Sequence, residues 1–351
     1  MSETNCKNSS WNNPMFEIDP NKLEPAIFCN GQDYLVYNNF NLSIFAEDRC
    51  NADCGFCVAQ LRYETRSKAY KKEKMKSKQA YLDRLQRVLR GLDWLHPSVS
   101  ITGGEPTLCP VLFDIISMVA RMGIRKRVIT TNGSNLLDRH PLMGKNLLLH
   151  LIDKGFQHIN ISRAHFADPT NQAIMKFDGM PCTNDMLSQI IPVAQQFGMR
   201  PRMSCVLLAE GISTFEQVID YIRFYKRFGC DNVIFREVMD FQPTNMVNEA
   251  KIEYCGKNRV PLEPIIEQMK CDPRFWHVTD IVGYYYHVTV FKFEGVDVCL
   301  ESANLSDLIQ QQDDNPDIIY ELVFHPNGNV TRDWIDSSEN LMPENTQEDR
   351  S

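Results

Sequence analysis

From about residue 41 to residue 236 the chain alternates short apolar runs with longer amphipathic segments, with a period of about thirty residues. This alternation is typical of βα units that surround a parallel sheet. The apolar runs predict six strands, near residues 42–46, 98–102, 127–131, 158–162, 201–207 and 232–236. The amphipathic segments predict helices near residues 78–92, 112–122, 144–154, 184–197 and 214–228. We therefore expect an α/β fold whose strands run parallel.

The flanking segments differ from this pattern. Residues 1–40 are rich in proline and asparagine, which predicts an irregular lead-in. Residues 237–336 contain β-rich runs at 284–293 and 318–324, and a Pro-Asn-Gly-Asn turn follows the second run. These features predict a small C-terminal cap that contains β-structure and a hairpin. Residues 337–351 are polar and acidic, and we expect a disordered tail there.

The composition is that of an ordinary folded protein. The 351 residues are 43% hydrophobic, which is enough for one large α/β domain with a smaller addition. The N-terminus lacks an apolar signal segment, and no run of about 18 apolar residues occurs. We therefore expect a cytoplasmic protein with no membrane partner. In a reducing compartment, the twelve cysteines are not expected to form disulfides.

The charge is acidic overall but uneven along the chain. A net charge of −8 argues against duplex nucleic acid as a partner, because such binding uses a basic surface. Residues 64–91, however, carry ten lysines and arginines. This run is interpreted either as a solvated helix face or as a docking site for an acidic substrate or reductase.

Three cysteines, Cys50, Cys54 and Cys57, follow the first predicted strand in the spacing CxxxCxxC. No fourth cysteine or histidine lies nearby in the sequence, whereas electron-transfer clusters and structural zinc sites usually have four protein ligands. Three thiolates can hold a [4Fe–4S] cube and leave one iron open to a small molecule. The alternative is a degenerate zinc site or three unrelated core cysteines. We interpret the three residues as cluster ligands.

A second motif, Gly103-Gly104-Glu105-Pro106, ends the second predicted strand. With the cysteines it resembles the radical S-adenosylmethionine (SAM) superfamily. The resemblance implies a partial (β/α)6 TIM-like barrel over residues 41–236. It also implies a [4Fe–4S] cluster and SAM as cofactors, with cleavage of SAM to a 5′-deoxyadenosyl radical. Ligands of such barrels gather at the C-terminal ends of the strands.

The resemblance extends along the barrel to the MoaA-like branch, the molybdenum-cofactor cyclases. The segments Thr130-Thr131-Asn132-Gly133 and 159–163 are similar to theirs, as are 201–207 and 233–239. The resemblance implies these SAM-binding residues: Phe56, Gly103, Gly104, Glu105, Thr131, Ser162 and Ser204.

Two further residues are candidates for catalysis. Arg163 follows the fourth predicted strand, where its register directs it to the C-terminal end of the barrel, although a structural ion pair is an equal alternative. His165 lies two residues further on. An imidazole titrates near neutral pH and can position a substrate or move a proton.

The resemblance fails in the C-terminal third. The cyclases carry a C-terminal CxxC, a further cysteine and a Gly-Gly tail, whereas Cys255, Cys271 and Cys299 have no such spacing and the tail is absent. GTP cyclisation and an auxiliary cluster are therefore not expected. We predict instead hydrogen abstraction from a small, nucleoside- or sugar-like molecule.

Other functions and partners remain open. The alternative is a peptide-modifying enzyme of a natural-product (RiPP) pathway, in which the strand at 284–293 would pair with a leader peptide. A non-enzymatic iron–sulfur protein is the third hypothesis. The expected partners are SAM, an unknown substrate and an electron donor such as flavodoxin or ferredoxin.

Overall fold

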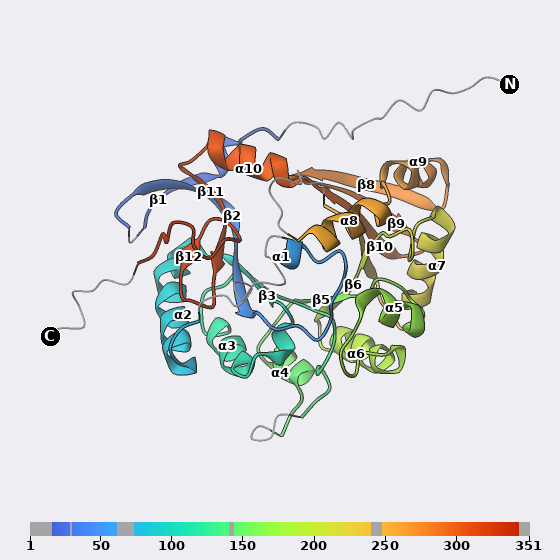
Figure 1. The fold of residues 1–351 in the computed structure, drawn as a ribbon, viewed down its shortest axis with the longest axis horizontal. Helices are drawn as coiled ribbons and strands as arrows, with labels where there is room; N and C mark the ends of the chain where they lie inside the picture. The colour runs from blue at the N-terminus through green and yellow to red at the C-terminus, as the bar shows by residue number, and fades with distance from the viewer. Residues whose placement is uncertain (1–15, 29, 62–73, 140–143, 240–247, 344–351) are drawn as a thin grey trace.

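The computed structural model describes residues 16–28, 30–61, 74–139, 144–239 and 248–343. Its centre is a parallel sheet with the six predicted strands in chain order (Figure 1). Their bounds are β2 (Asp33–Glu47), β3 (Ser98–Gly103), β4 (Lys126–Thr131), β5 (His158–Ser162), β6 (Arg200–Val206) and β7 (Asn232–Arg236). Because each strand is parallel to the next, all six C-terminal ends lie at one edge. The predicted α/β partial barrel is confirmed.

Helices connect these strands along the outside of the sheet (Figure 1). They are α2 (Lys78–Leu92), α3 (Leu112–Val119), α4 (Leu147–Asp153), α5 (Asp168–Met175), α6 (Asn184–Gln196) and α7 (Phe215–Lys226). The sequence predicted all but α5. Local chemistry sets their starts: the side chain of Ser77 caps α2, and Thr214 forms a capping box with Gln217 at α7. Their apolar faces pack on the sheet in one large core.

The described part of the N-terminal segment, residues 16–28 and 30–40, contains regular strands, contrary to the expectation of an irregular lead-in, and residues 1–15 lie outside the described residues. A short turn precedes β1 (Leu23–Ile27), which pairs antiparallel with the first part of β2. Strand β2 itself begins at Asp33, well before the predicted start. Tyr34 and Val36 alternate with exposed residues and are buried in the main core. This period of two is the ordinary signal of a strand with one covered face.

The C-terminal region extends the sheet at both edges. Strand β10 (Val296–Ala303) adds in parallel beside β7 and is followed outward by β9 (Tyr286–Phe293) and β8 (Phe275–Val282). At the other edge β11 (Ile318–Phe324) lies parallel to β2 and forms the predicted hairpin with β12 (Val330–Thr331). The predicted β-containing region is therefore continuous with the barrel sheet. Its helices are α8 (Glu249–Asn258), α9 (Glu263–Cys271) and α10 (Leu305–Asp314).

This arrangement corrects the predicted site of leader-peptide pairing. The β-rich run at 284–293 forms β9, and both of its edges are occupied, one by β8 and the other by β10. A peptide strand cannot pair with it without displacing a neighbour. Burial of Phe291 and Phe293 in the core explains why this run is so apolar.

The predicted disorder from residue 337 is wrong for residues 337–343, whereas residues 344–351 lie outside the described residues. Leu341 is 0% exposed, and its backbone amide donates a hydrogen bond to the carbonyl of Val330 at 2.8 Å. The buried guanidinium of Arg84 donates to the carbonyl of Met342. Two apolar residues and one backbone carbonyl therefore fasten a segment whose composition is mostly polar.

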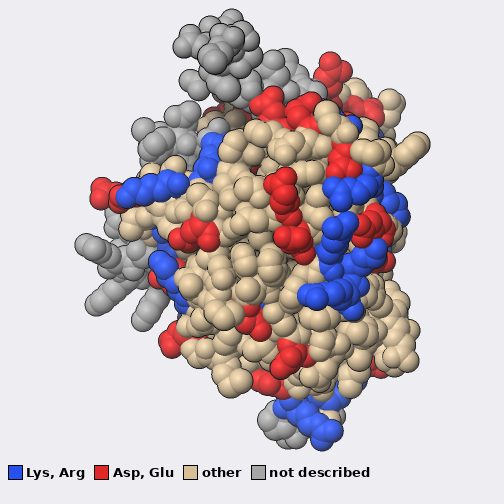
Figure 2. All heavy atoms as spheres, turned by 90° about the vertical axis from the view of Figure 1, so that its right-hand side faces the viewer, with Lys and Arg blue, Asp and Glu red and all other residues tan. Residues whose placement is uncertain are grey.

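The lysines and arginines of the basic run at 64–91 lie in different environments where the structure describes them. Lys74 pairs with Asp48 at 2.5 Å, and Arg84 is buried, so the run is not one solvated face. Figure 2 shows one side of the molecule, where basic and acidic side chains are interspersed. Pairs such as Arg223 with Glu294 belong to this mixed surface chemistry. No helix among the described residues is long and apolar enough to cross a membrane.

We expect Leu341→Ala to lower the free energy of unfolding by about 2–4 kcal/mol, because it removes a fully buried side chain and leaves a cavity. Ile335→Ala is the matched control, since Ile335 is 48% exposed and its loss should change stability by less than about 0.5 kcal/mol. Urea denaturation followed by circular dichroism measures both. Equal midpoints for the two variants would show that the 337–343 segment contributes nothing to stability.

Candidate functional site

The three motif cysteines lie on residues 48–57, here termed the cluster loop, which follows β2. Cys50 is exposed, and Cys54 and Cys57 are half-buried. The amide of Cys57 donates to the carbonyl of Cys54 at 3.2 Å, which closes a tight turn between the last two cysteines. The amide of Ala52 donates to the sulfur of Cys50 at 3.4 Å. None of the ten described cysteines is in a disulfide.

The three thiols lie close enough to affect one another. Although Cys50 is exposed as a whole residue, loss of water around its sulfur raises the pKa of the thiol to about 11, and the nearby Glu105 and Cys57 act in the same direction. The pKa of Cys54 is also raised, first by burial and then by Cys57 and Cys50. A cation among the thiols would favour their deprotonation. Iron can act in this way, because a coordinated thiol is deprotonated.

The described residues hold no three His, Cys, Asp or Glu side chains that already converge on a single metal ion. That finding is compatible with a cube, whose irons are separate and do not need three sulfurs at one point. Three mutually close thiols on one loop fit the donor set of a three-cysteine [4Fe–4S] site. Cys50, Cys54 and Cys57 would hold the cluster.

The Gly-Gly-Glu-Pro motif holds the cluster loop in place. The amide of Gly104 donates to the carbonyl of Glu47 at 2.6 Å, and that of Glu105 donates to the carbonyl of Arg49 at 2.8 Å. A Cβ on Gly104 would lie 2.3 Å from the carbonyl oxygen of Arg49. Gly103 has φ +146°, and a Cβ there would lie 2.3 Å from the carbonyl oxygen of Glu47. Both glycines are required because the two backbones touch.

Glu105 joins this contact to the loop after β4. Its side chain is 1% exposed and accepts hydrogen bonds from the hydroxyl of Thr131 at 2.5 Å and the amide of Asn132 at 2.7 Å. The side-chain amide of Asn132 donates in turn to that of Asn51 in the cluster loop at 2.7 Å. Burial raises the pKa of Glu105, and these donors oppose the rise. These contacts hold the cluster loop and the loop after β4 in fixed positions. Contact of Glu105 and Thr131 with SAM stays a prediction.

A cavity of about 310 Å³ lies beside the cluster loop, at the C-terminal ends of β2, β3, β6, β7 and β10. Two of the predicted SAM-binding residues, Phe56 and Gly103, line it. Most of its wall is apolar or aromatic, and includes Phe45, Phe56, Val206, Tyr285, Leu308 and Trp334. Such a cavity, mostly apolar with few polar groups, is the usual form of a small-molecule site.

The polar part of the wall includes an ion pair between two strands. The Nε of Arg236, at the end of β7, donates to Glu301 on β10 at 2.7 Å. Another nitrogen of the same guanidinium donates to the hydroxyl of Ser204 at 2.6 Å. Ser162 lies directly beside Ser204 in the register of β5 and β6. The predicted residue Ser204 is therefore not part of the cavity lining, but it is hydrogen-bonded to the lining residue Arg236.

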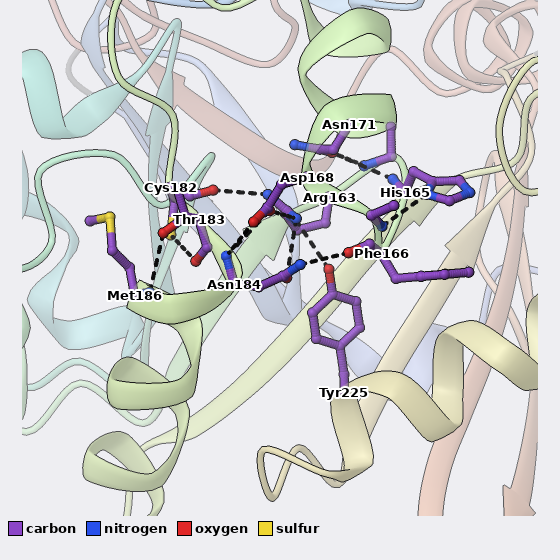
Figure 3. A network of polar contacts seen from close by, with 12 residues as sticks. Arg163, His165, Phe166, Asp168, Asn171, Cys182, Thr183, Asn184, Met186 and Tyr225 are labelled. Atoms are coloured by element: carbon purple, nitrogen blue, oxygen red, sulfur yellow. Dashed lines mark hydrogen bonds and ion pairs between the residues drawn. The ribbon is translucent and has the colours of Figure 1, made fainter.

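Arg163 does not line this cavity. It is 1% exposed, and its guanidinium donates to four oxygens (Figure 3). The acceptors are the hydroxyl of Tyr225 at 3.1 Å, the carbonyl of Cys182 at 2.8 Å, Asp168 at 2.6 Å and Asn184 at 3.2 Å. These contacts join β5 to α5, α6 and α7. The geometry gives Arg163 a structural part instead of the predicted catalytic one.

His165 lies in the same network (Figure 3). Its Nδ1 accepts a hydrogen bond from the amide of Ala167 at 2.9 Å, and its ring stacks on Phe166 with centroids 4.4 Å apart. Burial, together with the charge of Arg163, lowers its pKa. The ring is therefore neutral near pH 7 and is outside the lining of the cavity. The predicted proton-transfer role has no support in these contacts.

Comparison with known proteins identifies the family. The model of the radical SAM superfamily matches residues 47–222, just over half of the chain. The chain belongs to the radical SAM superfamily. It is therefore an enzyme of a superfamily that uses a [4Fe–4S] cluster and SAM, and the match begins at the cluster loop and ends within α7.

Several curated relatives act on nucleotides or in cofactor synthesis, as their names state. GTP 3′,8-cyclase of Aquifex aeolicus is 25% identical over 67% of this chain and 65% of its own length. Molybdenum cofactor biosynthesis protein 1 of Drosophila melanogaster is 28% identical over 61% of this chain, but the match spans only 34% of that protein. A SAM-dependent nucleotide dehydratase of Flammeovirga pacifica is 25% identical over 55% of this chain and 60% of its own length.

Solved radical SAM structures are similar over part of the fold. Streptococcus suis SuiB bound to its precursor peptide SuiA has a TM-score of 0.42 and 21% identity, over 56% of this chain and 39% of SuiB. The methyltransferase TsrM of Kitasatospora setae, with tryptophan and a SAM analogue bound, has a TM-score of 0.40 and 11% identity over 56% of this chain and 36% of its own.

One residue of the cavity wall was missed by the sequence analysis. Glu301 faces the cavity because β10 lies beside β7, and its partner Arg236 is 65 positions away in the chain. An isolated glutamate in an apolar strand is a weak hint of such a pair, since carboxylates are seldom buried alone. Arg236 itself stood at the end of a predicted strand, where functional residues of barrels gather.

We expect Gly104→Ala to lower the iron bound per chain after anaerobic reconstitution by about twofold or more, because the new Cβ displaces the backbone that leads into Cys50. The control is Gly256→Ala on α8, where a Cβ meets nothing within 4 Å. Iron and sulfide analysis with the visible absorbance of the cluster measures both. Full iron in Gly104→Ala would mean that the contact with the cluster loop is not needed for assembly.

We expect Arg163→Met to lower the free energy of unfolding by about 2–4 kcal/mol, because it leaves buried acceptors without their donor. Arg90→Met, at an exposed position of α2, should change it by less than about 0.5 kcal/mol. Chemical denaturation measures both. A stable Arg163→Met protein with lost turnover would restore the catalytic interpretation.

Proposed function

We propose that this protein cleaves SAM reductively to a 5′-deoxyadenosyl radical and uses that radical to abstract hydrogen from a small, nucleoside- or sugar-like substrate. The observation that carries the proposal is the cavity beside the cluster loop, lined by Phe56 and Gly103 on one side and by Arg236 and Glu301 on another. When bound, the cluster supplies the electron for cleavage of the carbon–sulfur bond of SAM.

The protein's own residues bind the reactants and exclude water. The three thiols hold the cluster at the edge of the cavity, and the aromatic wall offers Phe56, Tyr285 and Trp334 for stacking with flat rings. Leu308 of α10 and Trp334 after β12 belong to the C-terminal region, so that region completes the wall. A closed, apolar wall protects a reactive radical from side reactions.

The polar groups favour a substrate with hydroxyls over one with several phosphates. Among the described lining residues, the charged ones are Arg236, Glu301 and Glu237, and the single cation, Arg236, is already paired with Glu301 while Glu237 pairs with Arg259. A polyphosphate would require an excess of positive charge there. Sugar hydroxyls, in contrast, can donate to Glu301. The names of the curated relatives, which include nucleotide enzymes, support a nucleoside-like substrate.

An external protein must supply the electron. We propose flavodoxin or ferredoxin as the electron donor, because a low-potential cluster accepts electrons from such carriers. Cys50 is the exposed member of the cluster loop and marks the side of the site that faces outward.

Anaerobic reconstitution with iron, sulfide, SAM and dithionite tests the first step through the formation of 5′-deoxyadenosine. Deuterated nucleosides and sugars then test the second, because hydrogen abstraction transfers deuterium into 5′-deoxyadenosine. We expect transfer from a nucleoside and none from a peptide. Transfer from peptides alone would overturn the proposed substrate class in favour of a peptide-modifying enzyme.

We expect Glu301→Gln to reduce deuterium transfer from the productive substrate by about tenfold or more, because a hydrogen bond to a charged group contributes about 1.5–3 kcal/mol. Glu253→Gln on α8 is the control, since that carboxylate pairs with Lys257 on the exposed surface. Mass spectrometry of 5′-deoxyadenosine measures both. Equal transfer in the two variants would place substrate binding away from the Arg236–Glu301 pair.

A further inference from the structure

Helix α8 packs against the cluster loop. Figure 1 shows it beside α1 (Val58–Leu61), the short helix that directly follows the three cysteines, and the two helices are in contact. Residues 249–258 lie beyond the segment that the superfamily model matches. Their contacts with the loop are therefore a feature of this chain's C-terminal region.

Lys251 makes the main polar contact between the two segments. It is 7% exposed, and its Nζ donates to the carbonyl of Cys54 at 2.6 Å and to Asp53 at 2.8 Å. Burying an ammonium group is unfavourable unless it is paired and hydrogen-bonded. Here both partners belong to the cluster loop, and one of them is the backbone of a cluster ligand. The position of this cation is therefore tied to the position of Cys54.

The same face of α8 fixes the next residue of the loop. A Cβ on Gly55 would lie 2.5 Å from the ring of Tyr254, so the loop backbone rests directly on that ring. The thiol of Cys255 points to the carbonyl of Gly55 at 3.9 Å. Lys251, Tyr254 and Cys255 are spaced i, i+3 and i+4, which places them on one side of the helix.

The positive charge of Lys251 would also affect the reduction potential of a bound cluster. A cube held by three thiolates becomes more negative when it accepts an electron. A cation near it stabilises the reduced form more than the oxidised form, by Coulomb's law in a partly buried environment. Hydrogen bonds to the sulfurs and exposure to solvent also affect the potential of such clusters.

We propose that Lys251 is a positioning residue for the cluster, one that fixes the backbone of Cys54 and raises the reduction potential of the bound cluster. The C-terminal region then serves radical generation as well as substrate binding. This inference rests on the cluster of the superfamily and is independent of the proposed substrate.

Three variants of the full chain separate the donor from the charge. Lys251→Arg keeps both, Lys251→Gln keeps a donor without the charge, and Lys251→Met removes both. Lys257→Met is the matched control, because Lys257 lies on the same helix with its side chain exposed and paired with Glu253. Each protein is reconstituted anaerobically without SAM, and two properties are measured: the rate of iron loss to a chelator and the midpoint potential followed by electron paramagnetic resonance.

We expect Lys251→Met to lose iron about tenfold faster than the wild type and to have a more negative midpoint potential. Lys251→Gln should retain iron more nearly as the wild type does but share the negative shift, and Lys251→Arg and Lys257→Met should match the wild type in potential. If Lys251→Met does not fold, the potential of Lys251→Gln still decides the matter. Wild-type potential in Lys251→Gln, or wild-type iron retention in a folded Lys251→Met, would overturn the proposal.

Discussion

The site depends on the hydrogen bonds of one buried carboxylate, that of Glu105. It accepts hydrogen bonds from the loop after β4, while its own backbone amide binds the start of the cluster loop. Asn132 and Asn51 close the connection between these two segments. Three loops at the ends of three neighbouring strands are thus held as one unit. A carboxylate can do this at 1% exposure only because donors satisfy its oxygens.

The extension of the sheet gives the C-terminal third its part in the site. Strand β10 brings Glu301 beside Arg236, and α10 and the segment after β12 add Leu308 and Trp334 to the cavity wall. Helix α8 reaches the cluster loop through Lys251. Residues from 248 onward therefore contact both the cluster loop and the cavity. The region expected to form a small β-containing cap is continuous with the barrel sheet.

Whether the role of a candidate residue could be predicted depends on how many of its contacts come from residues distant in the sequence. Gly104 could be read from the sequence, because a glycine pair after a strand indicates close backbone approach. Arg163 could not, since register alone does not show which side of the barrel its long side chain takes. Its acceptors come from three helices and from the segment before α6, and their combined geometry draws the guanidinium away from the cavity.

The sequence by itself determined the six barrel strands, most of their helices, the spacing of the three motif cysteines and the glycine motif. Each of these is a local property: an apolar period, a helix cap, a ligand spacing or a tight turn. Only the tertiary structure decided that β10 and β11 join opposite edges of one sheet, that Leu341 is buried, and that Glu301 meets Arg236 across 65 positions. Such pairings depend on which distant surfaces can cover one another, and local periodicity carries no information about that choice.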